Sequence, residues 1–269
     1  MQELKKINNN IPTDEYIDPL ISVITVVFNG EKHLGNTIKS IIPNKNSSVE
    51  YIVIDGGSSD NTVKIAEKYN TFIDYFISEP DDGIYDAMNK GASIAKGKYI
   101  SFLNASDEYF KDTLRIISNK IENHDYDYLV APVIIASSEG KQIKISYPIK
   151  NFIYNFGSYM KMPAPHLSVF MKKEFFFELD GYDLSFSLSS DYDLLLRASA
   201  ISNNVCYIDN LVGIFSLGGI SGSHKTNVDN FRVLQKHGLL FYKNIFIFIY
   251  FSITLFLRKI LPYKFLTFF

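Results

Sequence analysis

The order of apolar runs in residues 21–103 limits the fold of this chain more than any other feature. The first run, residues 21–28 (ISVITVVF), is almost entirely β-branched or aromatic, which is typical of a strand buried on both faces. Three more short apolar runs follow, with helix-forming segments between them. This order predicts a parallel sheet covered by helices on both sides. The expected strands are 21–28, 50–55, 73–77 and 98–103, and the expected helices are 31–42, 60–69 and 84–95.

The second half of the chain has a mixed pattern. We expect a helix near 111–122, then strands over 128–136 and 142–147 joined by a hairpin at 137–141. The predicted fold class is α/β, a mostly parallel mixed sheet flanked by helices, with an amphipathic or apolar helical tail. The predicted divisions are a flexible lead-in over 1–18, one main domain over 19–225 and a C-terminal helical segment over 226–269.

Charge and cysteine content exclude several classes of protein. The chain has 27 Lys and Arg against 29 Asp and Glu, a net charge of −2, so we expect no nucleic-acid partner. Cys206 is the single cysteine, which excludes an internal disulfide framework and a multi-cysteine zinc site. Residues 1–18 are polar and lack the apolar stretch of a secretory signal, which favours the cytosol.

Polar residues follow four successive strands of the predicted sheet. They are Asn29 and the residues in 55–60, 78–83 and 104–107. Ligands of open parallel sheets bind beyond the carboxyl ends of the strands. Turn preferences alone would account for any one of these loops, but less well for all four. Neither a phosphate loop nor a dinucleotide fingerprint is present, so a bound nucleotide would be held by carboxylates and a divalent metal.

Four segments in order make the sequence similar to glycosyltransferase family 2, whose members have the GT-A fold. The resemblance covers roughly residues 19–220. It implies transfer of a sugar from a nucleotide-sugar donor, usually UDP-linked, with inversion at the anomeric carbon. The segments are 21–30 (ISVITVVFNG), 53–62 (VIDGGSSDNT), 78–107 and 190–198 (SDYDLLLRA).

The resemblance implies a set of donor-binding residues. Thr25, Val27 and Asn29 would line the pocket for the base and ribose. Asp55 would accept a hydrogen bond from the uracil ring, whose N–H suits a carboxylate.

Further donor contacts are implied by the loops at 79–91 and 104–107. Asp82 and Asp86 would touch the donor sugar or ribose, although early acids also favour a helix start. Met88 stands where relatives often have Arg or Lys, so neutralisation of the diphosphate would fall to Lys90 or to the metal alone. The remaining donor contacts implied by the resemblance are Asn104, Ala105 and Ser106.

The metal motif of the family is reduced in this chain. Many relatives have acids at the first and third places of the segment that reads NASD here, and only the last acid, Asp107, remains. One carboxylate is sufficient for Mn²⁺ or Mg²⁺ when diphosphate oxygens and water complete the shell. Asp107 is therefore the predicted metal ligand, with His224 as a weaker candidate. The alternative for Asp107 is an N-cap of the helix near residue 111.

Asp191 is the predicted general base, which takes the proton from the attacking acceptor hydroxyl. It opens a helix, and Asp193 two residues later can pair with Arg197. The alternative is that both acids only favour a helix N-terminus. His166 matches a position that faces the sugar site in relatives, but a lone histidine beside an apolar run is also common as a structural residue.

The C-terminal segment is predicted to meet a membrane surface. Residues 239–257 are apolar but interrupted by Lys243-Asn244, which leaves 13 residues before Arg258-Lys259. A span needs about 20, so the composition favours a helix lying in the headgroup region. A buried core helix, a homodimer helix and a true span remain as alternatives.

These observations give one functional hypothesis and two alternatives. The chain would be a metal-dependent inverting glycosyltransferase, peripheral to the cytoplasmic face of a bacterial inner membrane. It would extend a lipid-linked saccharide for a surface polysaccharide such as O-antigen or capsule. The alternatives are a non-catalytic nucleotide-sugar-binding or scaffolding subunit, and a nucleotidyltransferase, which would more often show a Gly- and Arg-rich phosphate loop near the first strand.

Overall fold

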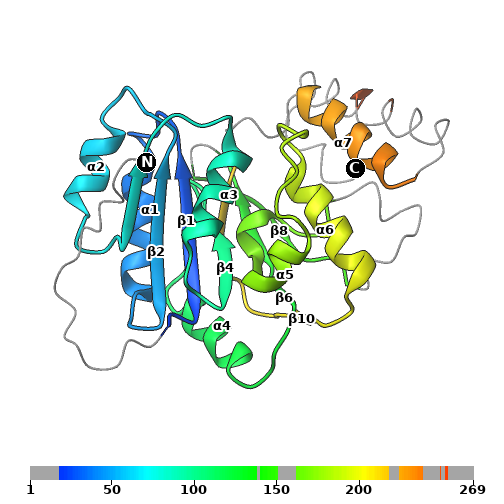
Figure 1. Cartoon of the computed structure of the whole chain (residues 1–269), viewed down its shortest axis with the longest axis horizontal. Coiled ribbons are helices and arrows are strands. Elements are labelled where there is room, and N and C mark those ends of the chain that lie inside the picture. The colour runs from blue at the N-terminus through cyan, green and yellow to red at the C-terminus, as the bar shows by residue number, and fades with distance from the viewer. Residues whose placement is uncertain are drawn as a thin grey trace.

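The computed structural model describes residues 18–137, 140–150, 162–217 and 224–238, together with 249 and 252–253 (Figure 1). Its main sheet has seven strands in the order β10-β6-β9-β4-β1-β2-β3. The four strands expected in the first half are present, and each pairs in parallel with its neighbours among them. They are β1 (Ile21–Val27), β2 (Val49–Asp55), β3 (Tyr75–Ser78) and β4 (Tyr99–Phe102).

The other three strands of the main sheet come from the second half of the chain. β9 (Val169–Lys172) is antiparallel to both β4 and β6 (Tyr128–Val130), and β10 (Val205–Tyr207) is parallel to β6. The predicted α/β class with a mostly parallel mixed sheet is confirmed.

A second, four-stranded sheet has the order β5-β11-β7-β8. The predicted hairpin is present, since β7 and β8 pair antiparallel. The prediction of one strand over 128–136 is wrong, because the run divides between the two sheets at Pro132, which has no N–H for a ladder. The strands of this sheet are β5 (Glu108–Tyr109), β7 (Val133–Ala136), β8 (Gln142–Ser146) and β11 (Gly213–Ser216).

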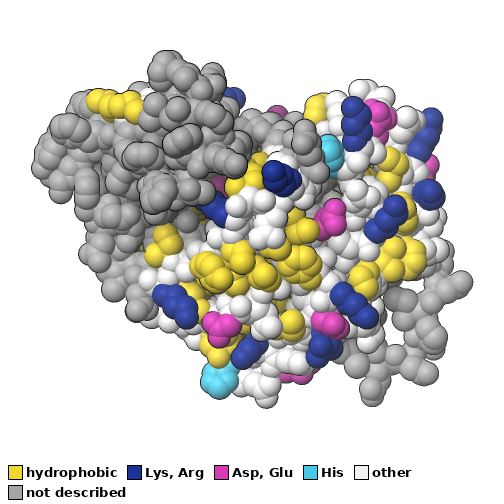
Figure 2. All heavy atoms as spheres, turned by 180° about the vertical axis from the view of Figure 1, so that it is seen from behind, with side chains coloured by type: hydrophobic (Ala, Val, Ile, Leu, Met, Phe, Trp, Pro, Cys, Tyr) yellow, Lys and Arg dark blue, Asp and Glu magenta, His cyan; other side chains and the backbone are white. Residues whose placement is uncertain are grey.

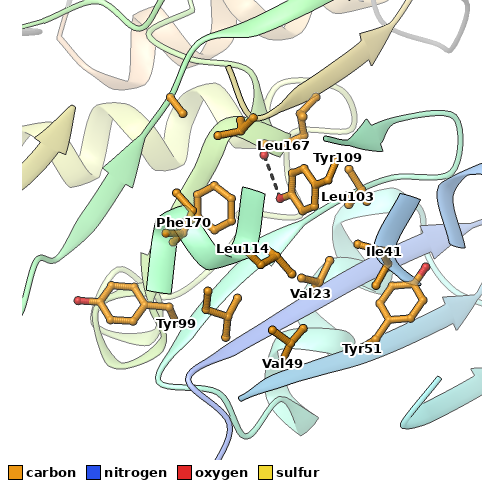
Figure 3. Close-up of a cluster of buried hydrophobic side chains, with 14 of the residues drawn as sticks. Val23, Ile41, Val49, Tyr51, Tyr99, Leu103, Tyr109, Leu114, Leu167 and Phe170 are labelled. Atoms are coloured by element: carbon orange, nitrogen blue, oxygen red, sulfur yellow. Dashed lines mark hydrogen bonds between the residues drawn. The ribbon is translucent and has the colours of Figure 1, made fainter. Parts of the chain in front are cut away.

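Helices cover both faces of the main sheet. Alternate residues of β1 point to opposite faces: Ile21 and Val23 join one cluster, and Ile24 joins the other. The first cluster, part of which is shown in Figure 3, includes buried residues of α1, α2 and α4, and the second includes those of α3, α5 and α6. The helices are α1 (Leu34–Ile41), α2 (Thr62–Lys68), α3 (Ile84–Ile94), α4 (Thr113–Ile121), α5 (Lys173–Glu178), α6 (Ser190–Ile201) and α7 (His224–Lys236), with short 3₁₀ turns η1 (Ile42–Asn44) and η3 (His166–Ser168).

Gly91 lets α3 lie close against β1. A Cβ atom at this position would come within 2.4 Å of Ile24 Cγ2 and 3.4 Å of Ile54 Cγ1. A side chain there would push α3 away from the sheet. This contact matters for the site, because α3 follows directly after the predicted donor loop.

The α7 helix, which lies at the start of the predicted C-terminal helical segment, packs on α6 (Figure 1). Val233 and Leu234 of α7 are fully buried against Tyr192 and Leu196 of α6. Most of the predicted membrane-associating segment lies outside the described residues. Within the part that the structure describes, no helix is both long enough and apolar enough to cross a bilayer.

The described surface carries both signs of charge. On the face seen in Figure 2, Lys and Arg side chains alternate with Asp and Glu around hydrophobic ones. This distribution agrees with the small net charge of −2.

Candidate active site

Two distant carboxylates meet across one imidazole ring at the predicted rim. His166 Nε2 lies 3.2 Å from Asp107 Oδ2, and His166 Nδ1 lies 3.9 Å from Asp191 Oδ2. The side chains of Asp107, His166 and Asp191 are 3%, 11% and 17% exposed. The fold therefore unites the predicted metal ligand, the predicted base and the predicted sugar-site histidine.

Asp107 is held by hydrogen bonds to its side chain and to its backbone. Its Oδ1 accepts the N–H of Ser216 in β11 at 3.0 Å, and its carbonyl accepts the Thr37 hydroxyl at 2.9 Å. The alternative role as a helix cap is wrong, because Asp112 occupies the N-cap position of α4. One oxygen, Oδ2, is directed at His166.

Asp191 lies in the first turn of α6. Its Oδ1 accepts hydrogen bonds from the Tyr85 hydroxyl and from the Tyr192 N–H, both at 2.9 Å. Burial raises the pKa of Asp191 above its usual value, although His166 and Tyr85 act in the opposite direction. A carboxylate with a raised pKa is a stronger base, as proton abstraction requires.

His166 lies between the two acids in the η3 turn. Burial alone would lower the pKa of His166, but Asp107 and Asp191 outweigh it, so the pKa lies above 6.5. The ring also meets the Phe215 ring edge to face, with centroids 5.6 Å apart. His166 thus supplies a partly positive group between two negative ones.

A small cavity lies beside Asp191 and His166. Its volume is about 10 Å³, about the space of one water molecule. Apart from these two residues and Tyr182, its lining is apolar, including Phe102 of β4 and Leu194 of α6. This low-polarity wall explains why burial dominates the pKa of Asp191.

The ends of β1 and β2 are tied together by side chain–backbone hydrogen bonds. Asn29, at a φ of 48°, accepts the Ser59 N–H on Oδ1 at 2.9 Å, and its own N–H donates to Ser58 Oγ. Asp55 is fully buried and accepts bonds from the Ser58 N–H at 3.0 Å and the Ser78 hydroxyl at 2.6 Å. Asp55 and Asn29 are thus both at the rim, with their oxygens engaged by neighbouring loops.

The side chains of Thr25 and Val27, two of the predicted donor contacts, are buried in the structure. Thr25 is fully buried, where its hydroxyl donates to the Leu103 carbonyl at 2.7 Å and accepts from Tyr51 at 3.0 Å. Val27 is also buried. The direction in which each β1 side chain points could not be predicted from the continuous apolar run, because both faces of β1 are covered.

Phe28 is the aromatic residue that the strand end presents to the outside. Its side chain is 65% exposed, and it directly follows Val27, the register partner of Asp55. Its place in the apolar run 21–28 predicted that Phe28 belongs to the buried strand. The available signal was its position immediately before the Asn29-Gly30 break.

The loop after β3 is organised around Lys90. The Lys90 ammonium lies 3.3 Å from both Glu79 and Asp86 and donates to the Pro80 carbonyl at 3.2 Å. Asp86 Oδ2 also accepts the N–H of Asp82 at 3.1 Å. The predicted donor residues Asp82, Asp86 and Lys90 therefore form one connected group.

Asp81, which the sequence analysis did not assign, lies against Gly56. A Cβ at Gly56 would come within 2.4 Å of Asp81 Oδ2. The absence of a side chain at Gly56 therefore allows Asp81 to approach the end of β2, next to Asp55.

The 104–107 loop is strained at Ser106. Its φ is 103°, a region that L-residues seldom adopt, and its N–H donates to Thr37 Oγ1 at 3.1 Å. Ala105 is half-buried against the core. Asn104 Oδ1 is buried and has no hydrogen-bond partner. His224 begins α7, and its side chain lies outside the described part.

These residues fit a hard divalent cation that takes few ligands from the protein. Across the described ranges, no three His, Cys, Asp or Glu residues group closely enough to hold a metal. The Asp107 carboxylate and the unpartnered Asn104 oxygen are nevertheless the donor types that Mn²⁺ and Mg²⁺ accept, with diphosphate and water completing the shell.

The fold is shared with solved structures of low sequence identity. The chain is similar in structure to S. aureus TarS 1-349 in complex with UDP-GlcNAc, with a TM-score of 0.61 at 17% identity, over 86% of this chain and 71% of that one. It is also similar to the mannosyltransferase PcManGT from Pyrobaculum calidifontis, in complex with GDP-Man and Mn²⁺, with a TM-score of 0.60 at 13% identity, over 89% and 70% of the two chains. The expected GT-A fold is confirmed.

The family follows from the sequence comparisons. The model of glycosyl transferase family 2 matches residues 22–181, so the chain belongs to this family and is a glycosyltransferase. An uncharacterised glycosyltransferase of Mycobacterium tuberculosis is 29% identical over 231 residues, covering 82% of this chain and 83% of its own length. A PGL/p-HBAD biosynthesis glycosyltransferase of Mycobacterium bovis is 26% identical over 183 residues, covering 66% and 69%.

Proposed function

We propose that this glycosyltransferase inverts the anomeric centre of a nucleotide sugar and uses Asp191 as general base. The observation that carries the proposal is the meeting of Asp191 and Asp107 across His166 at the ends of the strands. A single displacement needs two elements: a general base and a site that holds the departing diphosphate. One must accept a proton, and the other must organise the departing diphosphate.

The chemistry is a single displacement. The acceptor hydroxyl oxygen forms a bond to the anomeric carbon while the bond from that carbon to the diphosphate oxygen breaks. Asp191 takes the hydroxyl proton, and the nucleoside diphosphate leaves with the bonding electron pair. When bound, Mn²⁺ or Mg²⁺ would neutralise charge on the diphosphate. Asp107, supported by Asn104, would hold the cation.

The donor is proposed to be UDP-linked. Asp55 and the exposed Phe28 lie at adjacent positions of the β1–β2 end, where a carboxylate and an aromatic face suit a pyrimidine base. The TarS complex with UDP-GlcNAc supports a UDP sugar, while the PcManGT complex makes GDP-mannose the matching alternative.

The acceptor is proposed to be a hydroxyl of a lipid-linked saccharide in synthesis of a surface polysaccharide such as O-antigen or capsule. One relative is a PGL/p-HBAD biosynthesis glycosyltransferase, which supports a biosynthetic role for this chain. The aromatic, basic composition of residues 239–269 supports a peripheral place on the cytoplasmic face of a bacterial inner membrane.

The donor test is release of nucleoside diphosphate from UDP-GlcNAc, UDP-glucose, GDP-mannose and dTDP-glucose, each with Mn²⁺, Mg²⁺ or EDTA. We expect one donor to turn over with metal, and Asp191→Asn to lower that turnover about 10²–10⁴-fold while binding of the nucleotide persists. Asp125→Asn is the matched control, because Asp125 pairs with Lys98 and Lys172 outside the site. Binding of a donor with no turnover, even with lipid-linked acceptor, would favour the non-catalytic alternative.

The membrane test uses vesicles of phosphatidylglycerol and phosphatidylethanolamine. We expect the full chain to sediment with them and a chain lacking residues 240–269 to stay in the supernatant. Sedimentation unchanged by the deletion would reject the proposal, and a dimer lost with the deletion would assign the segment to a homodimer.

A further inference from the structure

We propose that Tyr85 is a positioning residue for the base, which holds Asp191 so that one particular oxygen receives the proton. This inference rests on the proposed role of Asp191. The Tyr85 hydroxyl and the Tyr192 N–H both donate to Oδ1, each at 2.9 Å. Oδ2 lies 3.9 Å from His166 Nδ1, beyond hydrogen-bond distance. Two donors on Oδ1 leave Oδ2 as the oxygen available to an acceptor hydroxyl.

Tyr85 is well fixed for this task. Its side chain is buried on α3, and its ring centroid lies 5.0 Å from that of Tyr182. The backbone of Tyr182 is bound in turn by Asn89 of the same helix, through bonds of 2.9 Å and 3.0 Å. Since Gly91 seats α3 closely on β1, the Tyr85 hydroxyl has little freedom to leave Asp191.

The hydroxyl remains a neutral donor over the working pH range. Burial, together with the negative charge of Asp191, raises the pKa of Tyr85 well above 10. The titratable groups that face Asp191 are Tyr85 from α3, His166 from η3 and Tyr182 from the turn before α6. Arg197 of the same helix is directed to Asp193. Of these groups, Tyr85 is the one whose hydrogen bond the Asp191 carboxylate accepts.

The position of Tyr85 also links the base to the donor loop. It lies three residues after Asp82 and one before Asp86, the predicted contacts to the donor. A donor that orders this loop would therefore also fix the residue that aims the base.

The test is the titration of the Asp191 carboxyl carbon by ¹³C NMR in aspartate-labelled protein, with the signal assigned by its loss in Asp191→Asn. Tyr85→Phe keeps the ring and removes the hydroxyl. We expect the Asp191 titration to move to higher pH by about one pH unit, the size expected for one hydrogen bond to a charged group. Tyr99→Phe is the control, because it removes a buried hydroxyl bonded to Tyr126 instead. It should leave the titration unchanged.

A second variant should shift the Asp191 titration in the opposite direction. Replacement of Tyr85 by 3-fluorotyrosine keeps a hydroxyl that donates more strongly, and should move the titration to lower pH. An Asp191 titration equal to wild type in both folded Tyr85 variants would overturn the inference.

The kinetic readout separates this inference from the proposed function. With the donor that turns over, Tyr85→Phe should lower kcat about tenfold and move the acidic limb to higher pH, while KM for the donor stays within twofold. Full turnover by Asp191→Asn would reject the proposed function and leave the titration result standing. Loss of turnover in Asp191→Asn, with a wild-type profile in Tyr85→Phe, would reject this inference alone.

Discussion

Asp107 and Asp191 are 84 positions apart in the sequence and lie on opposite sides of the His166 ring, at 3.2 Å and 3.9 Å from its two nitrogens. Each carboxylate favours the protonated ring, and the ring in turn favours the anionic form of Asp191. The arrangement brings two acids together around one ring in a nearly buried place. In the proposed mechanism one of these acids binds a cation and the other accepts a proton.

The raised pKa of Asp191 predicts the acid side of the pH–activity profile. In the proposed mechanism activity requires the Asp191 carboxylate, so activity should fall as pH decreases through the Asp191 pKa, which burial places above 3.8. His166→Gln removes a group that favours the anion and should move this limb to still higher pH. The measurement is kcat/KM against pH for wild type and His166→Gln with one donor. A limb at lower pH in the variant would contradict the assigned electrostatics.

Phe28 predicts a binding defect without a chemical one. Stacking of a base on an aromatic side chain contributes about 1–3 kcal/mol, so Phe28→Ala should weaken UDP binding about tenfold. Because Phe28 does not touch the reacting atoms in this proposal, kcat should change less than threefold. The control is Phe177→Ala, an exposed phenylalanine of α5, which follows β9 at the opposite end of the sheet. Calorimetry measures the affinity of each variant for UDP. Equal affinities in the two variants would show that Phe28 is not part of the binding site.

Gly91 and Gly35 predict opposite effects of the same substitution. Gly91→Ala should destabilise the protein by about 1–3 kcal/mol, because its Cβ would meet Ile24 at 2.4 Å. Gly35 lies in helix α1, and a Cβ atom there would meet only Ile65 of α2, at 3.8 Å. Gly35→Ala should therefore stabilise the protein by about 0.5–1 kcal/mol. Urea unfolding of the two variants compares the signs directly. A stabilised Gly91→Ala protein would show that α3 does not depend on this close approach.

The early strands could be predicted because each is a local apolar run with its own boundaries. The run over 128–136 was less informative: Pro132 marks a break within it, but only the tertiary structure shows that its two halves enter different sheets. The orientation of Thr25 was also hidden, because alternation disappears when both faces of a strand are buried.

In the candidate site, too, residues in local motifs could be predicted, whereas contacts between residues far apart in the sequence could not. Asp55, Asp107 and Asp191 could be proposed because strand ends and motif order place them at one rim. The bond from Tyr85 to Asp191 spans 106 positions and has no local signal. His166 was named at its position, but its place between two acids depends on the packing of η3 against β11.

Asp193 predicts acid sensitivity in the contact between α6 and α7. Its side chain is fully buried and lies 2.7 Å from Arg197 Nε and 2.9 Å from both the Lys236 ammonium and His237 Nε2. Burial alone would raise the pKa of Asp193, but these partners lower it to about 2. The gap between this value and the ordinary 3.8 corresponds to about 2 kcal/mol of stability.

The sign of the effect follows from the lowered pKa in the folded state. The stabilisation is complete above pH 3.8 and is lost as pH falls from there toward 2. Asp193→Asn should lower the free energy of unfolding by about 3 kcal/mol at pH 7, since Arg197 and Lys236 would lose their buried partner. The variant's stability should also depend less on pH between 2 and 3.8. Asp112→Asn is the control, because its exposed pair with Arg115 contributes less than about 1 kcal/mol. The measurement is the thermal unfolding temperature of the three proteins between pH 2 and 7. If this temperature falls with pH equally in Asp193→Asn and wild type, Asp193 is not the acid-sensitive group.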